Sequence, residues 1–123
     1  MKLKFRAWLK KEQKMDNEID HISWLEDELY CIGDGITYMV SAEDLELMQS
    51  TGLVDRDGKM IFEGDIVKMS KDVYSEPTYY EVVRHRGGAY RLESKQHGCE
   101  LWLRHTDCEV VGNVFENKEL LDA

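Results

Sequence analysis

Apolar and polar residues alternate over several short stretches of this chain, as in strands that have one buried face. Residues 3–10 alternate in this way, and after a polar turn a second strand is predicted at Met15–Ile22. Leu29–Ile32 and Ile36–Val40 lie on either side of Gly33-Asp34-Gly35, which predicts a hairpin. The first third of the chain is therefore expected to form antiparallel strands.

Two segments in this region also carry helical signals. Ser23-Trp24-Leu25-Glu26 matches a capping box, so one helical turn could form there. Ser41–Asp44 could cap a short helix before Leu45–Gln49. The pattern of residues 41–49 fits a helix and a strand equally well, and both assignments stay open.

Further strands are predicted in the second half of the chain. Tyr79–Arg86 and Ala89–Glu93 flank Gly87-Gly88, which is the clearest hairpin pattern in the sequence. Leu101–Leu103 predicts the apolar centre of another strand. The last strand is expected at Cys108–Phe115, and Asn117 is expected to cap a final turn that holds Leu120 and Leu121.

Between these halves, residues 48–67 predict three strands joined by tight turns. Three glycines stand at the corners: Gly52, Gly58 and Gly64. Asp57-Gly58 is a turn pair, because Asp can bond nearby backbone amides and Gly adopts positive φ without steric cost. Asp65 is expected to accept hydrogen bonds from turn amides as the next strand begins.

Many short strands, frequent glycine turns and few helical patterns indicate a mainly β protein that forms a meander or barrel. With 123 residues, 42% of them hydrophobic, the chain is long enough for one domain with its own core. No internal repeat, low-complexity tract or linker interrupts it.

Three motifs in the chain resemble the YopX family of phage and prophage proteins. They are TGLVDRDGKMIFEGDIV at residues 51–67, KFRAW at 4–8 and EVVGNVFEN at 109–117. Residues 68–108 match the family only loosely. The resemblance implies a phage-encoded protein with an SH3-type β-barrel region, in one YopX-like domain over residues 1–123. Its N-terminal antiparallel extension would occupy about 1–45 and its barrel-like part about 46–123. The family's motifs carry no activity to transfer.

The three cysteines, Cys31, Cys99 and Cys108, are scattered and odd in number, which indicates reduced thiols. The basic, alternating N-terminus lacks the apolar core of a signal peptide. No apolar run approaches the ~20 residues of a membrane span. These features predict a soluble protein in the bacterial cytoplasm.

The net charge is −9, and the charges are unevenly distributed. Acidic residues dominate the region from Asp16 to Asp65, whereas basic residues dominate the N-terminus and a segment near residues 78–105. The two signs either pair across the surface or leave a polarised surface that steers a charged partner. A strongly negative total disfavours nucleic-acid binding, which depends on clustered Lys and Arg.

Two groups of residues suggest metal sites, and their spacing argues against both. If Gly58 is the invariant glycine of a calcium loop, the first ligand position falls on Leu53 and the twelfth on Gly64. A zinc site would draw on His97, Cys99, His105 and Cys108. An extended segment would place Cys99 roughly 20 Å from His105, too far for one tetrahedral site. No metal and no cofactor is therefore predicted.

The Gly87-Gly88 hairpin suggests a candidate binding face. A two-residue loop pairs Arg84 with Arg91 and Val83 with Leu92. Arg84, Arg86 and Arg91 then share one face and could bind phosphate or an acidic partner surface, unless nearby glutamates neutralise them. The opposite face, with Val83, His85, Tyr90 and Leu92, is expected to be buried.

The sequence contains no phosphate-binding loop, nucleophile elbow or HExxH motif. Our leading interpretation is a non-catalytic phage or prophage accessory protein that binds an unidentified host or phage protein. The alternatives are a nucleic-acid-binding module that uses the arginine face of the 79–93 hairpin, and an uncharacterised enzyme. The three tryptophans and six tyrosines could stack on bases but are expected to fill the core and its rim.

Overall fold

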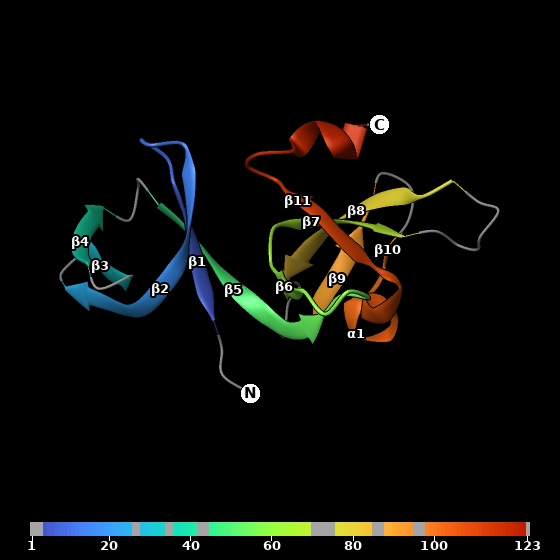
Figure 1. The fold of residues 1–123 in the computed structure, drawn as a ribbon, viewed down its shortest axis with the longest axis horizontal. Helices are drawn as coiled ribbons and strands as arrows, with labels where there is room; N and C mark the ends of the chain where they lie inside the picture. The colour runs from blue at the N-terminus through green and yellow to red at the C-terminus, as the bar shows by residue number, and fades with distance from the viewer. Residues whose placement is uncertain are drawn as a thin grey trace. The chain divides into compact units, whose positions relative to one another are not determined.

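The protein is mainly β, with two antiparallel sheets and little helix (Figure 1). The computed structural model describes residues 4–25, 28–33, 36–41, 45–69, 76–84, 88–94 and 98–122, with only the backbone for those between 18 and 41 and for residue 122. Contacts divide the chain into two compact units, Met1–Ser50 and Thr51–Ala123. No helix in the described ranges is long and apolar enough to cross a membrane.

The first unit is a single antiparallel sheet with the strand order β4-β3-β2-β1-β5. Its strands are β1 (Phe5–Leu9), β2 (Lys14–Leu25), β3 (Glu28–Gly33), β4 (Ile36–Ser41) and the first half of β5 (Leu45–Val54). The turn after β1 brings Gln13 to a φ of 54°. The predicted antiparallel strands of this region are confirmed.

Strand β1 departs from the expected pattern of one buried face. Ala7, Trp8 and Leu9 are 0%, 6% and 8% exposed, and Arg6 is 8% exposed. Successive residues of a strand lie on opposite faces, so both faces of β1 are covered. The alternating sequence therefore predicted the strand correctly and its burial incorrectly.

The two helical signals of this region did not produce helices. Ser23–Leu25 belongs to β2, where Trp24 pairs with Leu29 of β3, so the predicted capping-box turn is wrong. From Leu45 onward the open segment is strand β5, which pairs with β1 along its first half. In both segments, pairing with a neighbouring strand outweighs a local helical preference.

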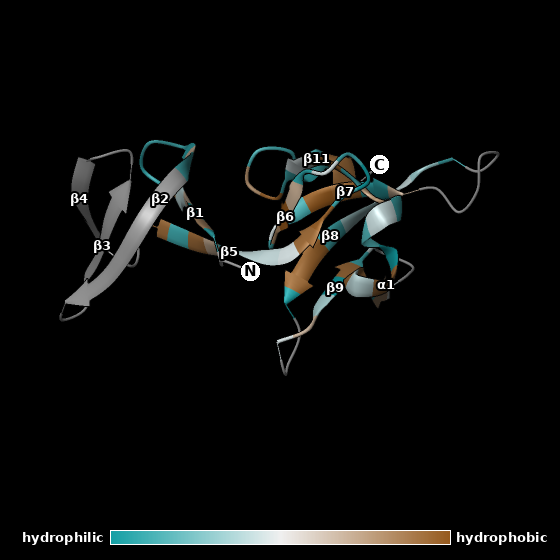
Figure 2. Ribbon diagram, turned by 60° about the horizontal axis from the view of Figure 1, so that its bottom comes forward, coloured by the Kyte–Doolittle hydropathy of each residue, from teal (hydrophilic) through white to brown (hydrophobic). Residues whose placement is uncertain are grey.

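The second unit contains a five-stranded antiparallel sheet with the order β10-β9-β8-β7-β11. The strands that follow β5 are β6 (Met60–Phe62), β7 (Asp65–Met69), β8 (Thr78–Arg84), β9 (Tyr90–Glu93), β10 (Gly98–Glu100) and β11 (Glu109–Asn113). The helical elements are α1 (Leu101–Arg104) and the 3₁₀ turns η2 (His105–Asp107) and η3 (Lys118–Asp122). Apolar residues concentrate on the strands of this unit (Figure 2).

Its core is one cluster of buried side chains contributed by strands, α1 and the residue after η2. The cluster contains Ile61, Val67, Met69, Tyr80, Val82, Leu92, Leu101 and Cys108. At about 25 cal/mol per Å² of apolar surface, burial of such side chains is the main term that holds the unit together.

Two of the three predicted corners of the central segment are confirmed. Gly58 and Gly64 lie in turns with φ values of 83° and 84°, whereas Gly52, with a φ of 81°, lies within strand β5 and joins no two strands. Asp65 is 1% exposed, and its Oδ2 accepts a hydrogen bond from the Phe62 amide at 2.8 Å. Asp57 has a different role from the one expected, because Asp55 is the residue that accepts the turn's amide hydrogens.

The predicted register of the β8–β9 hairpin is wrong by one residue. Arg84 pairs with Tyr90, and Val83 pairs with Arg91, so five residues lie between Arg84 and Tyr90 instead of a tight two-residue turn. A shift of one residue exchanges the faces of a strand. The buried face therefore holds Tyr80, Val82 and Leu92, while Val83 lies on the other face with Arg91.

Candidate protein-interaction site

The connection between β10 and β11 is helical, and two buried residues fix its ends in the core. Leu101 begins α1 and Cys108 follows η2, and both are 0% exposed members of the core cluster. The strand that the sequence pattern predicts at Leu101–Leu103 is therefore wrong. A helix turns successive residues by about 100°, so Leu101 can be buried while its two neighbours point outward.

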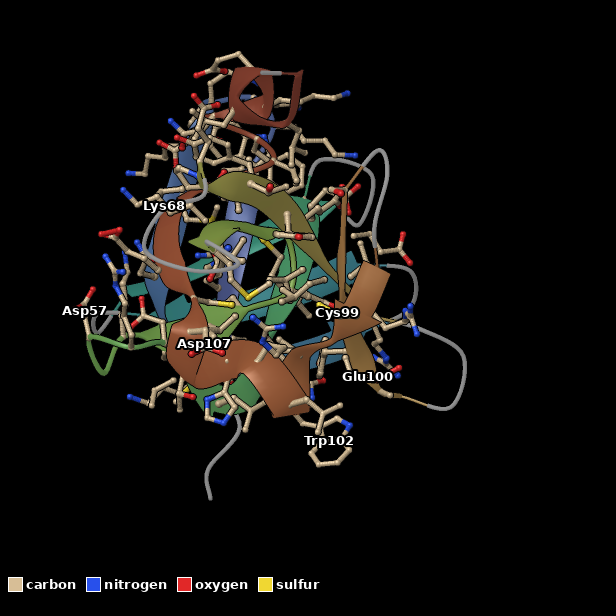
Figure 3. All side chains as sticks on the ribbon, turned by 90° about the vertical axis from the view of Figure 1, so that its right-hand side faces the viewer. Asp57, Lys68, Cys99, Glu100, Trp102 and Asp107 are labelled. Atoms are coloured by element: carbon tan, nitrogen blue, oxygen red, sulfur yellow. The ribbon has the colours of Figure 1, made fainter. Side chains whose placement is uncertain are left out.

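The residues that follow Leu101 expose large apolar side chains to solvent. Trp102 is 63% exposed and Leu103 is 58% exposed, and Trp102 projects away from the body of the second unit (Figure 3). Val54, at the end of β5, is the third large apolar side chain that is exposed among the residues with described side chains, at 39%. We call Val54, Trp102 and Leu103 the α1 surface.

Polar contacts join the parts of the α1 surface to one another. His105 places Nδ1 2.7 Å from the carbonyl oxygen of Val54, which links η2 to the end of β5. The Cys108 amide donates to the His105 carbonyl oxygen at 3.2 Å, and the Cys108 thiol donates to the Arg104 carbonyl oxygen at 3.3 Å. These hydrogen bonds hold the segment that carries Trp102 and Leu103 in place.

The charged groups near α1 are paired. Arg91 Nη1 donates to Glu100 Oε1 at 2.8 Å, directly before the helix. Arg104 Nε donates to Asp107 Oδ2 at 3.0 Å across the helix and the following 3₁₀ turn. The rim of the α1 surface is therefore polar, with both signs present in equal number. An apolar centre inside a polar rim is the usual anatomy of a protein interface.

The helix could have been found in the sequence by a weaker signal than the apolar run. Arg104 and Asp107 are three residues apart, which is the spacing of an ion pair on one helix face. In an extended strand, residues three apart lie on opposite faces and cannot meet in this way.

Three of the four zinc candidates lie in the described chain, and each has its own role. Cys99 packs against the core cluster, Cys108 is buried in it, and His105 contacts the Val54 carbonyl. His97 lies outside the described residues. Among those described, no three His, Cys, Asp or Glu side chains are grouped as a metal site would require.

Cys99 and Cys108 are the two cysteines whose side chains are described, and both have unreactive thiols. Burial raises the pKa of Cys108 to about 12, and the neighbouring Cys99 adds to the effect. Burial is also the main reason that the pKa of Cys99 lies above its usual value. A thiol reacts as its thiolate, so neither residue is activated as a nucleophile at neutral pH.

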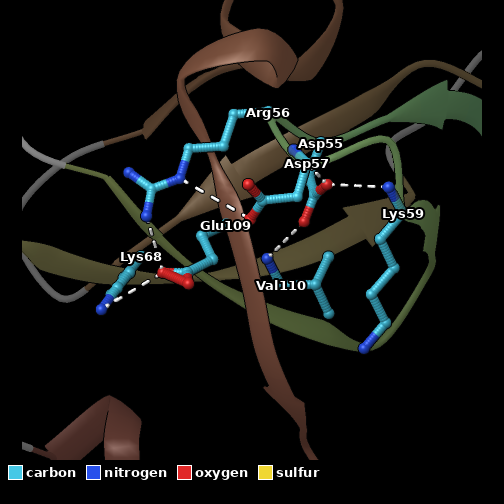
Figure 4. Close-up of polar contacts among 7 residues, drawn as sticks. All are labelled: Asp55, Arg56, Asp57, Lys59, Lys68, Glu109 and Val110. Atoms are coloured by element: carbon cyan, nitrogen blue, oxygen red, sulfur yellow. Dashed lines mark hydrogen bonds and ion pairs between the residues drawn. The ribbon is translucent and has the colours of Figure 1, made fainter.

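The acidic residues of the calcium hypothesis belong to a hydrogen-bonded turn (Figure 4). Asp55 Oδ1 accepts from the amides of Asp57 and Lys59, each at 2.9 Å, and Oδ2 accepts from the amide of Val110 at 2.9 Å. Burial works to raise the pKa of Asp55, but these three hydrogen bonds outweigh it, and the pKa lies below its ordinary value. Asp55 therefore joins β11 to the loop between β5 and β6.

Exposed charges lie beside this turn. Glu109 Oε2 is 3.0 Å from Arg56 Nη2 and 3.2 Å from Lys68 Nζ. Asp57 is 3.8 Å from the Arg56 Nε. The opposite charges of these residues compensate one another, and each ion pair contributes little to stability.

The structure does not bring the three arginines of the hairpin together on one face, as the predicted register required. Because the register is shifted, Arg84 and Arg91 lie on opposite faces of β8–β9. Arg84 is exposed beside Tyr90, whereas Arg91 pairs with Glu100 and lies 3.9 Å from Glu93. Arg86 lies outside the described residues.

Comparisons with known proteins agree with the three sequence motifs. Protein EF1440 from Enterococcus faecalis superposes with a TM-score of 0.67 at 27% identity, over 98% of this chain and 99% of that one. Protein yopX from Bacillus subtilis superposes with the same TM-score at 22% identity, over 95% of this chain and 96% of that one. A comparison with curated proteins gave no match. The family model described as YopX protein matches residues 4–122, and the chain therefore belongs to the YopX family.

Proposed function

We propose that this protein acts by binding another protein through the α1 surface. The observation that carries the proposal is the exposure of Trp102 and Leu103, adjacent on a short helix whose own anchor, Leu101, is buried. Large exposed apolar groups are costly to leave in water unless something covers them. Tryptophan is also the residue type most enriched among side chains that dominate binding energy.

The attachment of α1 favours tight binding. A side chain that is already held in place loses less conformational entropy when a partner covers it. Leu101 and Cys108 hold the segment from inside, and the contact between His105 and Val54 holds it from the side. The partner would then supply an apolar pocket for Trp102 and a shallower apolar surface for Leu103.

The charge of the protein narrows the class of partner. With a net charge of −9, the protein repels anionic surfaces at a distance and attracts cationic ones. The partner expected is a protein whose pocket has a neutral or basic rim. In keeping with the resemblance to phage and prophage proteins, we propose that it is a host or phage protein in the bacterial cytoplasm and that no reaction is catalysed.

The experiment is an affinity capture with Trp102→Ala and Leu103→Ala, followed by direct titration of the captured protein. Glu119→Ala, an exposed change in η3, serves as the control. A protein that binds the wild type and the control should lose about 2 kcal/mol of binding free energy, roughly 30-fold in affinity, with Trp102→Ala. Equal binding by all variants would overturn the proposal. Capture that disappears after nuclease treatment would point to nucleic acid instead.

For the fold of the second unit we propose an SH3-type barrel. The proposal is supported by five short antiparallel strands in one sheet and by helical turns directly before the last strand. An experimental structure in which β11 does not lie against β5 and β6, which end the six-stranded sheet, would contradict it.

A further inference from the structure

We propose that two copies of this chain pair through strand β4, edge to edge, and so form a dimer with one continuous sheet. The strand lies at one end of the six-stranded order β4-β3-β2-β1-β5-β6 (Figure 1). No strand among the described residues pairs with its outer side. Alternate residues of an edge strand direct their amide and carbonyl groups outward, where another strand can bond them.

The four sheet edges differ in how they are protected. Short strands, charged residues, bulges and prolines are the devices that prevent edge pairing. β6 and β10 have three residues each. β11 carries the Glu109 ion pairs and a register shift between Val110 and Gly112.

β4 has none of these devices. Its six residues, Ile-Thr-Tyr-Met-Val-Ser, include no charge, no proline and no glycine. Its pairing with β3 runs over all six residues without a register shift. Such a strand is a template for pairing, and natural proteins seldom leave one uncovered.

The order of residues across the sheet shows how a second copy would continue it. Across β2, β3 and β4, Ile22, Cys31 and Tyr38 form one row, and Trp24, Leu29 and Val40 form another on the same face. A two-fold axis perpendicular to the sheet, midway between the Tyr38 residues of the two copies, places these residues opposite each other and Ile36 opposite Val40 of the second copy. The apolar face then continues without a break across the dimer.

Self-pairing also suits the chemistry of the strand. In a two-fold interface each residue type meets the same short list of residues, so a charged edge would bring like charges together. β4 brings none. The net charge of −9 still repels at long range, so dimerisation is measured at about 0.15 M salt, where the Debye length is about 8 Å.

The test is sedimentation equilibrium of the full chain with one lysine introduced on β4. Thr37→Lys is chosen because Thr37 lies in the row of His21 and Ile32, on the face opposite to that of Tyr38. The two lysines would then stand at diagonal positions across the interface, with their backbones roughly 7–8 Å apart. Thr78→Lys makes the same chemical change at an exposed position of β8 and is the control.

The wild type and Thr78→Lys should form dimers, and Thr37→Lys should raise the dissociation constant by about tenfold or more. Amide exchange in β4 should slow as the wild-type concentration rises. A wild type that stays monomeric to about 100 μM, or a Thr37→Lys variant that dimerises like the control, would overturn the proposal. If circular dichroism shows that Thr37→Lys is unfolded, Thr37→Glu replaces it, because two copies would again bring like charges to diagonal positions. Trp102→Ala should leave the dimer intact, so this proposal and the α1 surface fail independently.

Discussion

Asp55 holds three backbone amides from two separate segments on one carboxylate. It is 3% exposed, and both of its oxygens are occupied by these backbone donors. Removing a buried acceptor leaves its donors without partners, which costs more than the hydrogen bonds contribute. Asp55 is therefore expected to matter far more than the exposed Asp57 next to it.

Asp55→Ala should lower the free energy of unfolding by roughly 3 kcal/mol or more, because the amides of Asp57, Lys59 and Val110 would be stranded. Asp57→Ala should change it by less than about 0.5 kcal/mol. Urea denaturation of both variants measures the difference. Equal effects would show that the turn does not depend on the Asp55 carboxylate.

The same carboxylate should make stability depend on acid pH. Its pKa is lowered in the folded protein, so its contribution is fully present above the unfolded value, about 3.9, and is lost as the pH falls through the lower folded value. Denaturation measured from pH 7 down to pH 2 should show this loss for the wild type. In Asp55→Asn the slope in this range should be smaller, and an unchanged slope would contradict the assignment.

Gly58 and Gly112 should respond differently to alanine. Gly58 has a φ of 83°, and a methyl group added there would have no atom within 4 Å, so Gly58→Ala should cost about 1 kcal/mol from backbone strain alone. At Gly112 a methyl group would overlap the side chain of Asn117, whose Oδ1 accepts from the Asn113 amide at 3.2 Å. Gly112→Ala should cost about 2–3 kcal/mol. Denaturation midpoints that reverse this order would refute it.

At the scale of the element, the β8–β9 hairpin contains an unfavourable pair that its shifted register creates. Glu81 lies opposite Glu93. Burial raises the pKa of Glu81, and the charge of Glu93 raises it further, while Lys118 partly offsets both. The folded state therefore binds a proton at Glu81 more tightly than the unfolded state does, and ionisation of Glu81 lowers stability.

Glu81→Gln should stabilise the protein at pH 7 by about 0.5 kcal/mol, because it removes the repulsion between directly opposed like charges. The gain should vanish below about pH 4, where Glu81 is protonated in the folded and unfolded states. Thermal denaturation at both pH values measures it, with Glu119→Gln as an exposed control. A loss of stability at pH 7 would mean that Glu81 has a favourable partner.

Local sequence could predict the elements that need a backbone conformation which only certain residues adopt easily. Gly58 and Gly64 mark corners because positive φ costs glycine little, whereas Gly52 has a positive φ inside strand β5. The hairpin register was missed because residues 85–89 offer several loop lengths, and sequence does not state which one the flanking pairs impose. Leu101–Leu103 was missed because a short apolar run fits a strand and a buried helical turn alike.

The candidate site could not be predicted from the sequence, for a related reason. Exposure of Trp102 depends on Leu101 and Cys108 both reaching the core, which is a property of the assembled unit. The importance of Asp55 over Asp57 likewise depends on Val110, far along the chain. Contacts of this kind are set by tertiary structure, and no pattern within a short window contains them.

At the scale of the whole molecule, the two similar structures show that this fold is compatible with very different sequences. At 27% and 22% identity, two proteins keep the arrangement over nearly the full length, each with a TM-score of 0.67. Cores tolerate many substitutions that keep volume and pattern, whereas turns and special contacts tolerate fewer. The motifs that identify the family accordingly surround the Asp55 turn and the start and end of the chain.

The reach of Asp55 to Val110 has a consequence for how the protein is made. The two residues are 55 positions apart, and the amide of Arg56 similarly donates to the Cys108 carbonyl oxygen at 2.9 Å. At about 5–20 residues per second, a ribosome needs roughly 3–11 s to add the second residue after the first. For most of that interval β7 lacks its neighbour β11, so one side of the strand stays unpaired. The nascent second unit therefore cannot complete its sheet until its last strand has been made.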